Sequence, residues 1–160
     1  MASEGFLTLD SLVVDISKVF EAYIRRVLLD HANSLGWQIV DGNEVFYPFF
    51  ADGNDFRVKP DVVIVAEGTP AAILDVKYKP DPKESDRYEI LAFMDALGIQ
   101  RGGFVCPQKA DSSSRYMGVT AGGKVLSTLR FDLAAADLEA ECTRFVQNVG
   151  VLIAAGSEYG

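Results

Sequence analysis

Apolar residues recur at helical spacing in three segments of the chain and predict three helices. Asp10 is the expected N-cap of the first helix, because its carboxylate can accept hydrogen bonds from the free amides of the first turn. Gly36 and Gly98 are expected to end the first two helices, since glycine readily adopts the left-handed backbone of a helix C-cap. The predicted helices are Asp10–Leu35, Ser85–Leu97 with Tyr88, Leu91, Met94 and Leu97 facing the core, and Ala134–Ala155.

Shorter runs rich in β-branched residues predict strands between these helices. Asp52-Gly53, Glu67–Pro70 and Gly122-Gly123 are turn signals that join neighbouring runs into hairpins. Pro80 and Pro82 prevent the segment before the second helix from being helical. Trp37–Val40 and Val45–Phe50 are predicted strand pieces, and with the strands Val58–Ala66 and Ala71–Lys79 they give three strands in meander after the first helix. The later predicted strands are Arg101–Pro107, Tyr116–Thr120 and Lys124–Asp132.

The order of these elements predicts one α/β (α+β) domain that spans residues 1–160. A helix, three strands, a helix and a strand form an αβββαβ core over about residues 10–107. We expect a central mixed sheet of four to six strands flanked by helices, since each element must bury its apolar face. A C-terminal hairpin and helix, at about residues 115–155, extend this core.

Composition narrows the class of protein. A hydrophobic fraction of 49% over 160 residues excludes general disorder, and no apolar run approaches the length of a membrane span. The first residues lack the basic and apolar regions of a signal peptide. Cys106 and Cys142 show no metal-site spacing and are expected to be free thiols. We therefore expect a cytoplasmic protein that does not engage a membrane.

Two acidic residues and a lysine interrupt the apolar strands within Val58–Lys79. Asp61 follows Pro60 near the start of one strand, and Asp75 lies two residues before Lys77 in the next. Because side chains alternate along a strand, Asp75 and Lys77 share a face. Asp and Lys are rarely buried unless they are paired, so a purely structural Asp75–Lys77 ion pair is one explanation. A catalytic site is the other.

Paired carboxylates on neighbouring strands suit metal-assisted hydrolysis of a phosphodiester. Mg²⁺ prefers oxygen ligands and keeps several waters, so Asp61 and Asp75 can hold it and leave positions for water and phosphate. The ion polarises the phosphoryl oxygen and lowers the pKa of the attacking water. The ammonium of Lys77 can stabilise charge that develops in the transition state. Lys79 points to the same face but, beside Pro80, is expected to be solvated.

The catalytic interpretation requires one particular strand register. A four-residue loop, Glu67–Pro70, would pair Asp61 with Val76 and place the two aspartates on opposite faces. A three- or five-residue loop, or a β-bulge, would place Asp61 opposite Asp75. Only the second arrangement brings both carboxylates to one ion.

Glu21 is a further acidic candidate, at the edge of the apolar stripe of the first helix and one turn before Arg25. An ion pair with Arg25 would account for it without any catalytic role and would stabilise the helix by about 0.2–0.5 kcal/mol. A role at a metal site of the neighbouring sheet is the alternative.

The formal net charge of −8 counts against DNA binding by bulk electrostatics. The basic residues are unevenly spread, however, and five of them gather around the motif. A locally basic site on an acidic domain fits a catalytic unit that relies on another domain or protein to grip DNA. These basic residues are Lys59, Lys77, Lys79, Lys83 and Arg87.

The pattern Pro-Asp, hairpin, Asp-x-Lys resembles the motif of the PD-(D/E)XK nucleases, and the αβββαβ order resembles their restriction-endonuclease-like fold. Within that superfamily the chain resembles the nuclease domain of the McrC type of restriction subunit over roughly residues 19–107. It departs from the family at Glu89, where the family usually has glutamine, and family members carry an additional N-terminal region. The resemblance is carried by Val19-Phe20-Glu21, Lys59-Pro60-Asp61-Val62-Val63, Leu74-Asp75-Val76-Lys77-Tyr78-Lys79 and Asp86-Arg87-Tyr88-Glu89.

The resemblance implies a Mg²⁺-dependent deoxyribonuclease, with Mn²⁺ able to substitute, that cuts DNA as the cleavage subunit or domain of a restriction or defence system. It implies metal ligation by Asp61, Asp75, the backbone carbonyl of Val76 and Glu21. Lys77 would complete the catalytic set. Candidate contacts to substrate phosphates are Lys59, Lys79, Arg87, Tyr88 and Glu89.

The resemblance also implies partners. The family works with a GTP-driven AAA+ NTPase motor that recognises modified DNA, so the expected partners are DNA and a motor subunit or a DNA-recognition domain, with a homodimer as a further arrangement.

Two other classes of protein stay open at this stage. One is a catalytically weak nuclease-fold module that binds or assembles with a motor ATPase. The other is a metal-dependent hydrolase of a phosphoester outside nucleic acids. Retention of Asp61, Asp75 and Lys77 together argues against the first, and the order of elements disfavours the second.

Overall fold

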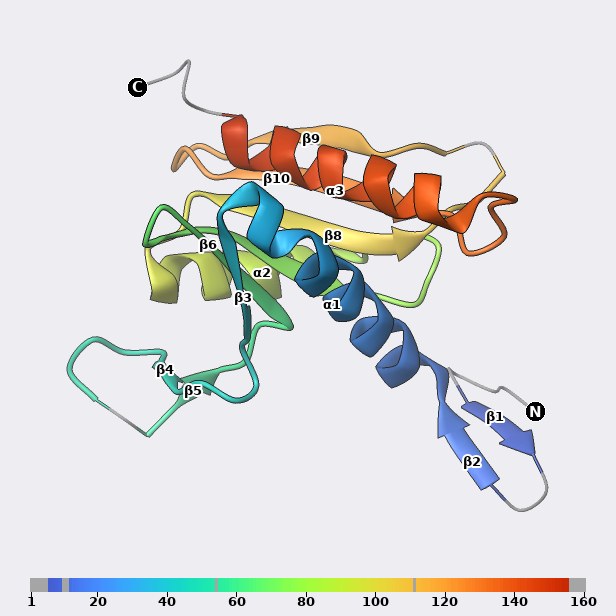
Figure 1. Cartoon of the computed structure of the whole chain (residues 1–160). Helices are drawn as coiled ribbons and strands as arrows, with labels where there is room; N and C mark the ends of the chain where they lie inside the picture. The colour runs from blue at the N-terminus through green and yellow to red at the C-terminus, as the bar shows by residue number, and fades with distance from the viewer. Residues whose placement is uncertain (1–5, 10–11, 54, 111, 156–160) are drawn as a thin grey trace.

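The computed structural model describes residues 6–9, 12–53, 55–110 and 112–155 (Figure 1). Its helices are α1 (Ile16–Leu35), α2 (Glu84–Leu97) and α3 (Leu138–Ala154). Its strands are β1 (Phe6–Leu9), β2 (Leu12–Asp15), β3 (Trp37–Asp41), β4 (Tyr47–Pro48), β5 (Arg57–Val58), β6 (Val62–Ala66), β7 (Thr69–Val76), β8 (Arg101–Pro107), β9 (Arg115–Val119) and β10 (Val125–Phe131).

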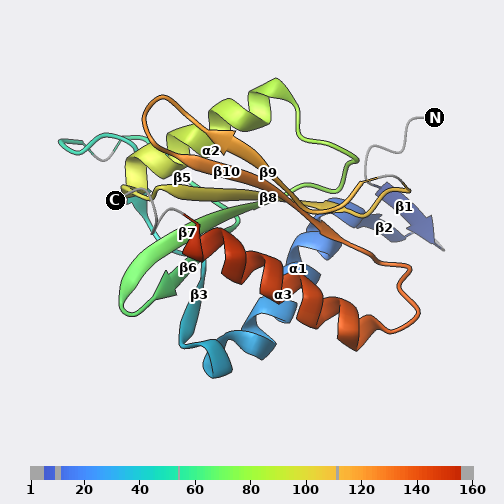
Figure 2. The same ribbon diagram turned by 90° about the horizontal axis from the view of Figure 1, so that it is seen from above.

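A mixed sheet in the order β3-β6-β7-β8-β10-β9 forms the centre of the described structure. β7, β8 and β10 are parallel to one another, and β3, β6 and β9 run antiparallel to their neighbours. α1 and α3 pack on one face of the sheet and α2 packs on the other (Figures 1 and 2). The chain order α1, β3, β6, β7, α2, β8 is the predicted αβββαβ core, so the fold is restriction-endonuclease-like, with the β9–β10 hairpin and α3 added after it.

The first helix begins later than the sequence pattern predicts. Asp15 is its N-cap, and its carboxylate accepts a hydrogen bond from the backbone N–H of Ser17 (3.0 Å). The preceding segment, Leu12–Asp15, is strand β2 and pairs with β1, because two successive valines favour a strand over a helix. Asp10 lies outside the described residues. Gly36 ends the helix in the left-handed conformation (φ 70°), as predicted.

The three-stranded meander is present as β3, β6 and β7, but the predicted segments Val45–Phe50 and Val58–Ala66 are each interrupted. β4 and β5 pair only with each other, as a small hairpin that projects from the main sheet (Figure 1). β3 therefore pairs directly with β6. Pro60 separates β5 from β6, because it has no N–H group to donate to a strand ladder.

A close backbone contact fixes the chain just before β6. A Cβ atom added to Gly42 would lie 2.0 Å from the carbonyl oxygen of Pro60. The turn that follows β3 therefore requires glycine, because any side chain at this position would displace Pro60. Asp61, the next residue along the chain, is placed by this contact.

Alternate residues of β7 enter two different cores. Leu74 and Val76 belong to the cluster beneath α1 and α3, whereas Ile73 belongs to the cluster beneath α2. Since side chains alternate along a strand, Asp75 lies on the α2 side of the sheet, and Lys77 follows on that side as predicted.

The core-facing side of α2 differs from the prediction at one position. Met94 is fully buried, as expected, but Tyr88 is 63% exposed. Ile90 is fully buried instead, because it lies four residues before Met94 and so on the same helix face, whereas Tyr88 lies six residues before it. Leu91 and Leu97 pack against the same cluster as partly buried side chains.

Glu141 joins the start of α3 to the end of β10. Its residue is 7% exposed, and its carboxylate accepts hydrogen bonds from the backbone N–H of Asp132 (2.9 Å) and from Nε of Arg144 (2.9 Å). Arg144 also donates to the carbonyl oxygen of Arg130 (3.0 Å). The Arg144 hydrogen bonds hold the pKa of Glu141 below its ordinary value.

Glu141→Gln should therefore lower the free energy of unfolding at pH 7 by about 1.5–3 kcal/mol, the range for hydrogen bonds to charged groups. Because the folded-state pKa is lowered, the stabilisation exists above the ordinary pKa of a glutamate and is lost as the pH falls through the folded-state value. Urea unfolding at pH 7 and pH 4 should show the difference between variant and wild type shrinking at the lower pH. Glu139→Gln, an exposed change in the same helical turn, is the control; equal losses in both variants would contradict the role of Glu141.

Candidate functional site

The turn between β6 and β7 sets the register that the catalytic interpretation requires. Glu67 and Gly68 both have positive φ (53° and 76°) and form a two-residue turn that pairs Ala66 with Thr69. A bulge between Ile64 and Val65 then shifts the pairing, so that further along Val62 lies opposite Leu74. If this register continues by one residue, Asp61 lies opposite Asp75. The structure therefore has the register that a β-bulge gives, and not the register of a four-residue loop.

Asp75 is the most buried charged group of the site. Its residue is 2% exposed, and its Oδ2 atom has no hydrogen-bond partner among the described residues. The nearest cation in an ion pair is the Nζ of Lys77, 3.3 Å from that oxygen. Burial and the neighbouring carboxylate of Asp61 raise the pKa of Asp75 to about 8, against the opposing effect of Lys77.

Asp61 faces Asp75 across the two strands. Its Oδ2 accepts a hydrogen bond from the backbone N–H of Val76 (2.8 Å), which fixes the carboxylate at the end of β7. Burial and the charge of Glu21 raise the pKa of Asp61, and the hydrogen bond from Val76 works in the opposite direction. Asp61 and Asp75 therefore form one interacting pair of carboxyl groups.

Lys77 is surrounded by carboxylates. Its Nζ lies 3.3 Å from Asp75, 3.2 Å from Glu89 and 3.7 Å from Asp86. Burial acts to lower the pKa of Lys77, but the charges of Asp75 and Glu89 outweigh it and raise that pKa above its ordinary value. The ammonium is therefore held charged, in the position predicted for it on the strand face of Asp75.

Lys79 is not solvated as expected. Its side chain is 28% exposed and forms an ion pair with Asp86 at the start of α2. Asp86 also accepts a hydrogen bond from the backbone N–H of Lys83 (2.6 Å), so it caps the helix. The pKa of Asp86 is lowered: its burial acts to raise the value, but the hydrogen bonds from Lys79 and Lys83 outweigh that effect. Asp86 thus ties both lysines to α2.

Glu21 and Arg25 form the predicted ion pair, 2.8 Å apart. Arg25 also contacts two further residues. Its Nη2 donates a hydrogen bond to the carbonyl oxygen of Asp61 (3.3 Å), and its Nη1 forms an ion pair with Asp41 (3.5 Å). Lys18 contacts the other oxygen of Glu21 at 3.7 Å. The Glu21 carboxylate is therefore held beside Asp61 by two cations.

One polar pocket of about 340 Å³ lies between the first two turns of α1 and the end of β7; Glu21, Asp61 and Lys77 line it, whereas the buried Asp75 does not. Among the described residues, no group of three or more His, Cys, Asp or Glu side chains converges as a ready-made metal site. The arrangement offers two carboxylates at most to one ion, with Glu21 alongside. The pocket is lined by Ser17, Lys18, Glu21, Asp61, Val76, Lys77, Tyr78 and Lys79.

The other candidate phosphate contacts are dispersed. Glu89 faces Lys77, as given above, and so is part of the charge network. Arg87 and Tyr88 lie on α2 and do not line the pocket, and Lys59 is exposed with no ion pair among the described residues. The contribution of Asp86 was missed from the sequence, because its contacts with Lys77 and Lys79 join separate elements and have no signature in spacing along the chain.

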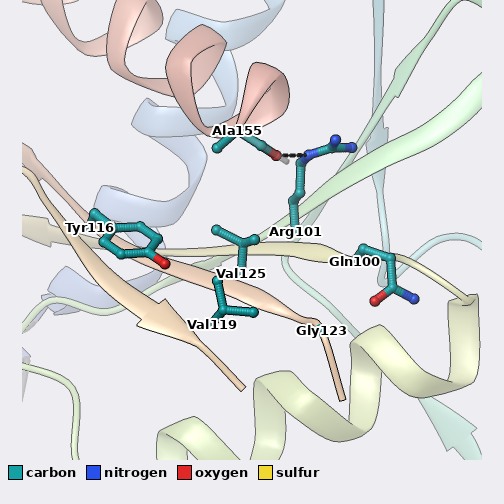
Figure 3. Close-up of a pocket in the computed structure, with 7 residues that line it drawn as sticks. All are labelled: Gln100, Arg101, Tyr116, Val119, Gly123, Val125 and Ala155. Atoms are coloured by element: carbon teal, nitrogen blue, oxygen red, sulfur yellow. Dashed lines mark hydrogen bonds between the residues drawn. The ribbon is translucent and has the colours of Figure 1, made fainter. Parts of the chain in front are cut away.

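A larger pocket of about 540 Å³ lies at the opposite end of β8 (Figure 3). Arg101 lines this pocket, and its guanidinium donates a hydrogen bond to the carbonyl oxygen of Ala155. Among the described residues, no carboxylate lines the pocket. It therefore lacks the charged groups that phosphodiester chemistry requires. Its lining residues are Gln100, Arg101, Tyr116, Val119, Gly123, Val125 and Ala155.

The raised pKa of Asp75 predicts how stability depends on pH. Between 3.8 and about 8 the folded protein keeps a proton on Asp75 that the unfolded chain releases, so the free energy of unfolding falls as the pH rises through this window. Asp75→Asn removes this titration and should flatten the dependence between pH 5 and pH 8. Urea unfolding in the absence of divalent cations measures it. Asp95→Asn, which alters an exposed carboxylate of α2, is the control, and parallel curves for wild type and Asp75→Asn would contradict the assignment.

None of the helices in the described part of the chain is long and apolar enough to cross a membrane. No curated protein sequence matches the chain. Among solved structures, one chain of the refined half-complex from the tetradecameric assembly of Thermococcus gammatolerans McrB AAA+ hexamers with bound McrC matches with a TM-score of 0.60 and 20% identity. The match covers 86% of this chain and 34% of that one, so this chain spans about a third of its length, and the likeness shows the fold.

A family model described as "McrBC 5-methylcytosine restriction system component" matches residues 2–107, which are more than half of the chain and include Glu21, Asp61, Asp75 and Lys77. The chain therefore belongs to the family of McrBC restriction system components.

Proposed function

We propose that this chain hydrolyses DNA phosphodiester bonds in a Mg²⁺-dependent reaction, as the cleavage subunit or domain of a restriction system. The observation that carries the proposal is the juxtaposition of Asp61, Asp75 and Lys77 in one charge network at the end of β7. Membership of the restriction family and the restriction-endonuclease-like fold support the same reaction.

The residues present fit a hard divalent cation. Oδ2 of Asp75 is buried with no hydrogen bond among the described residues, and the Lys77 ammonium, 3.3 Å away, is its ion-pair partner, so the oxygen keeps acceptor capacity that a cation can use. Asp61 and Asp75, with the carbonyl of Val76 and assistance from Glu21, supply only oxygen donors, which Mg²⁺ and Mn²⁺ prefer. When bound, the ion supplies Lewis-acid polarisation of the phosphoryl oxygen and an acidified water.

The side chains around these carboxylates have positioning roles. Arg25 holds Glu21 and the backbone of Asp61 together, so that α1 and β6 keep a fixed distance. Lys77 stays charged beside Asp75 and is placed to stabilise negative charge that develops on the phosphate in the transition state. Glu89 and Asp86 orient that ammonium from the α2 side.

The proposed partners are DNA and an AAA+ NTPase motor. The compared assembly contains McrB AAA+ hexamers with bound McrC, which motivates the second partner. The net charge of −8 supports a second protein that binds the DNA while this chain cuts it, because a strongly acidic domain gains little from long-range attraction to DNA. A DNA-recognition domain, or a second copy of this chain in a homodimer, would add DNA-binding surface in the same way.

A second candidate function is an assembly module with the fold but little catalytic activity. The internal pairing of charges favours it, because Lys77 already contacts three carboxylates and Glu21 already contacts two cations. A network that is neutralised by its own members can exist for stability alone. The two experiments below separate these functions.

The first experiment measures metal binding. Asp75→Asn should weaken Mn²⁺ binding by at least the ~10–100-fold that loss of a supporting group typically costs. Because burial and Asp61 raise the pKa of Asp75 to about 8, a cation bound at Asp75 competes with a proton, so binding to the wild type should release protons and give a calorimetric enthalpy that depends on the buffer. Asp95→Asn is the matched control. Equal Mn²⁺ affinity in wild type and Asp75→Asn would show that the metal site is misplaced.

The second experiment measures cleavage. Lys77→Ala should retain the fold and most of the Mn²⁺ affinity but lose plasmid cleavage by about 10²-fold or more, as for removal of a preorganised electrostatic group. Lys79→Ala should lose much less, since Lys79 pairs with Asp86 and not with Asp75. Both variants are assayed with Mg²⁺ and Mn²⁺ on plasmid and single-stranded DNA, with the motor partner added in a parallel series. Normal cleavage by Lys77→Ala, with Lys79→Ala inactive, would overturn the motif assignment.

A further inference from the structure

A second polar pocket, of about 420 Å³, lies between the segment that follows β7 and the loop that follows β8. We call it the basic pocket. Three of its lining side chains are cations and one is a carboxylate, so its described residues carry a surplus of positive charge on a chain whose net charge is −8. The basic pocket is lined by Asp81, Lys109, Ser112, Ser113, Arg115 and Arg130.

Arg130 is held rigidly in this pocket. Its residue is only 3% exposed; Nη1 donates to the carbonyl oxygens of Pro80 and Pro107, and Nη2 forms an ion pair with Asp81 at 2.5 Å. Lys109 contacts Asp81 from the other side. One carboxylate therefore serves two cations, which leaves positive charge unbalanced.

Donors in the basic pocket remain without partners. Nε of Arg130 and Oγ of Ser112 are buried and have no hydrogen bond among the described residues. Arg115 is exposed and has no ion pair in the described part of the chain. A guanidinium only donates hydrogen bonds, so the exposed, unpaired Arg115 beside the excess positive charge of the pocket fits a ligand with several acceptor oxygens and a negative charge. A phosphate group has this chemistry.

The basic pocket is close to the carboxylate pair. Lys79 lines the 340 Å³ pocket that Asp61 also lines, and Asp81 lines the basic pocket. Two residues of chain span at most about 7 Å. Cys106, on the neighbouring strand β8, is near the charged residues of both pockets. Burial raises the pKa of its thiol to about 11, and the charges of Arg130, Asp81, Lys79 and Asp75 also change that pKa. The two pockets thus flank the same end of β7 and β8.

We propose that the basic pocket binds a backbone phosphate of the DNA strand that is cut, next to the scissile phosphate. This inference rests on the proposed nuclease function and adds a positioning site to it. A phosphate fixed at Arg115, Lys109 and Arg130 would hold the strand in register, so that the next phosphate meets Asp75 and Lys77. Such a contact carries no sequence information and suits an enzyme whose recognition lies elsewhere.

The experiment uses Arg115→Ala and Lys109→Ala in the full chain, because Arg130 supports the backbone and its loss would disturb folding. Arg26→Ala is the matched control, since Arg26 is an exposed cation of α1 that pairs with Asp30. Binding of a labelled DNA duplex is followed by fluorescence anisotropy at several salt concentrations, with Ca²⁺ in place of Mg²⁺. Mn²⁺ affinity is measured in parallel.

Arg115→Ala should weaken duplex binding by about 10-fold and reduce the slope of log K against log salt by about 1, as expected for one lost phosphate contact. Lys109→Ala should act in the same direction, Arg115→Lys should restore the slope, and Arg26→Ala should change neither quantity. In cleavage assays the loss should lie in KM more than in kcat, with Mn²⁺ affinity unchanged.

Affinity and salt slope of Arg115→Ala and Lys109→Ala equal to those of Arg26→Ala would overturn the inference. That outcome is distinct from failure of the proposed function, which would appear as absence of DNA cleavage by the wild type with Mg²⁺ or Mn²⁺. Because anisotropy does not require cleavage, it tests the basic pocket whether or not the strand is cut.

Discussion

The burial of two interacting carboxyl groups is the constraint on which the rest of the structure depends. Removing a carboxylate from water is costly, and a second one beside it adds to the cost, so the pKa of Asp75 rises to about 8. Only Lys77 contacts it as a cation in the described residues. The folded chain therefore maintains a polar centre that weakens its own stability, and this is a common property of sites organised for a ligand rather than for packing.

The elements around the carboxyl pair are joined through charge as well as through apolar packing. On one side, Arg25 connects α1 to the backbone of Asp61 and to Asp41 at the end of β3. On the other, Asp86 connects the start of α2 to both lysines that follow β7. A helix from each face of the sheet is thus anchored at the same strand end, which makes the position of the site independent of any single loop.

The sequence was sufficient for the order of the αβββαβ core elements and for the shared face of Asp75 and Lys77, because apolar periodicity and strand alternation are local properties. It was insufficient for the register of Asp61, which depends on a bulge that alternation alone does not reveal. The late start of α1 and the ion pair of Lys79 were also missed, since the first depends on the Asp15 cap and the second on pairing with Asp86 across elements. Long-range pairing of charges has no signature in spacing along the chain.

The contact of Gly42 with Pro60 has a consequence for how this molecule can change. The turn after β3 lies against the residue that precedes Asp61, without room for a single methyl group. The β4–β5 hairpin lies between Gly42 and Pro60 in sequence, so its length and composition can change while these two residues stay in contact. The place where the chain re-enters the sheet is therefore fixed by a backbone contact, and this contact sets the position of Asp61, the first carboxylate of the site.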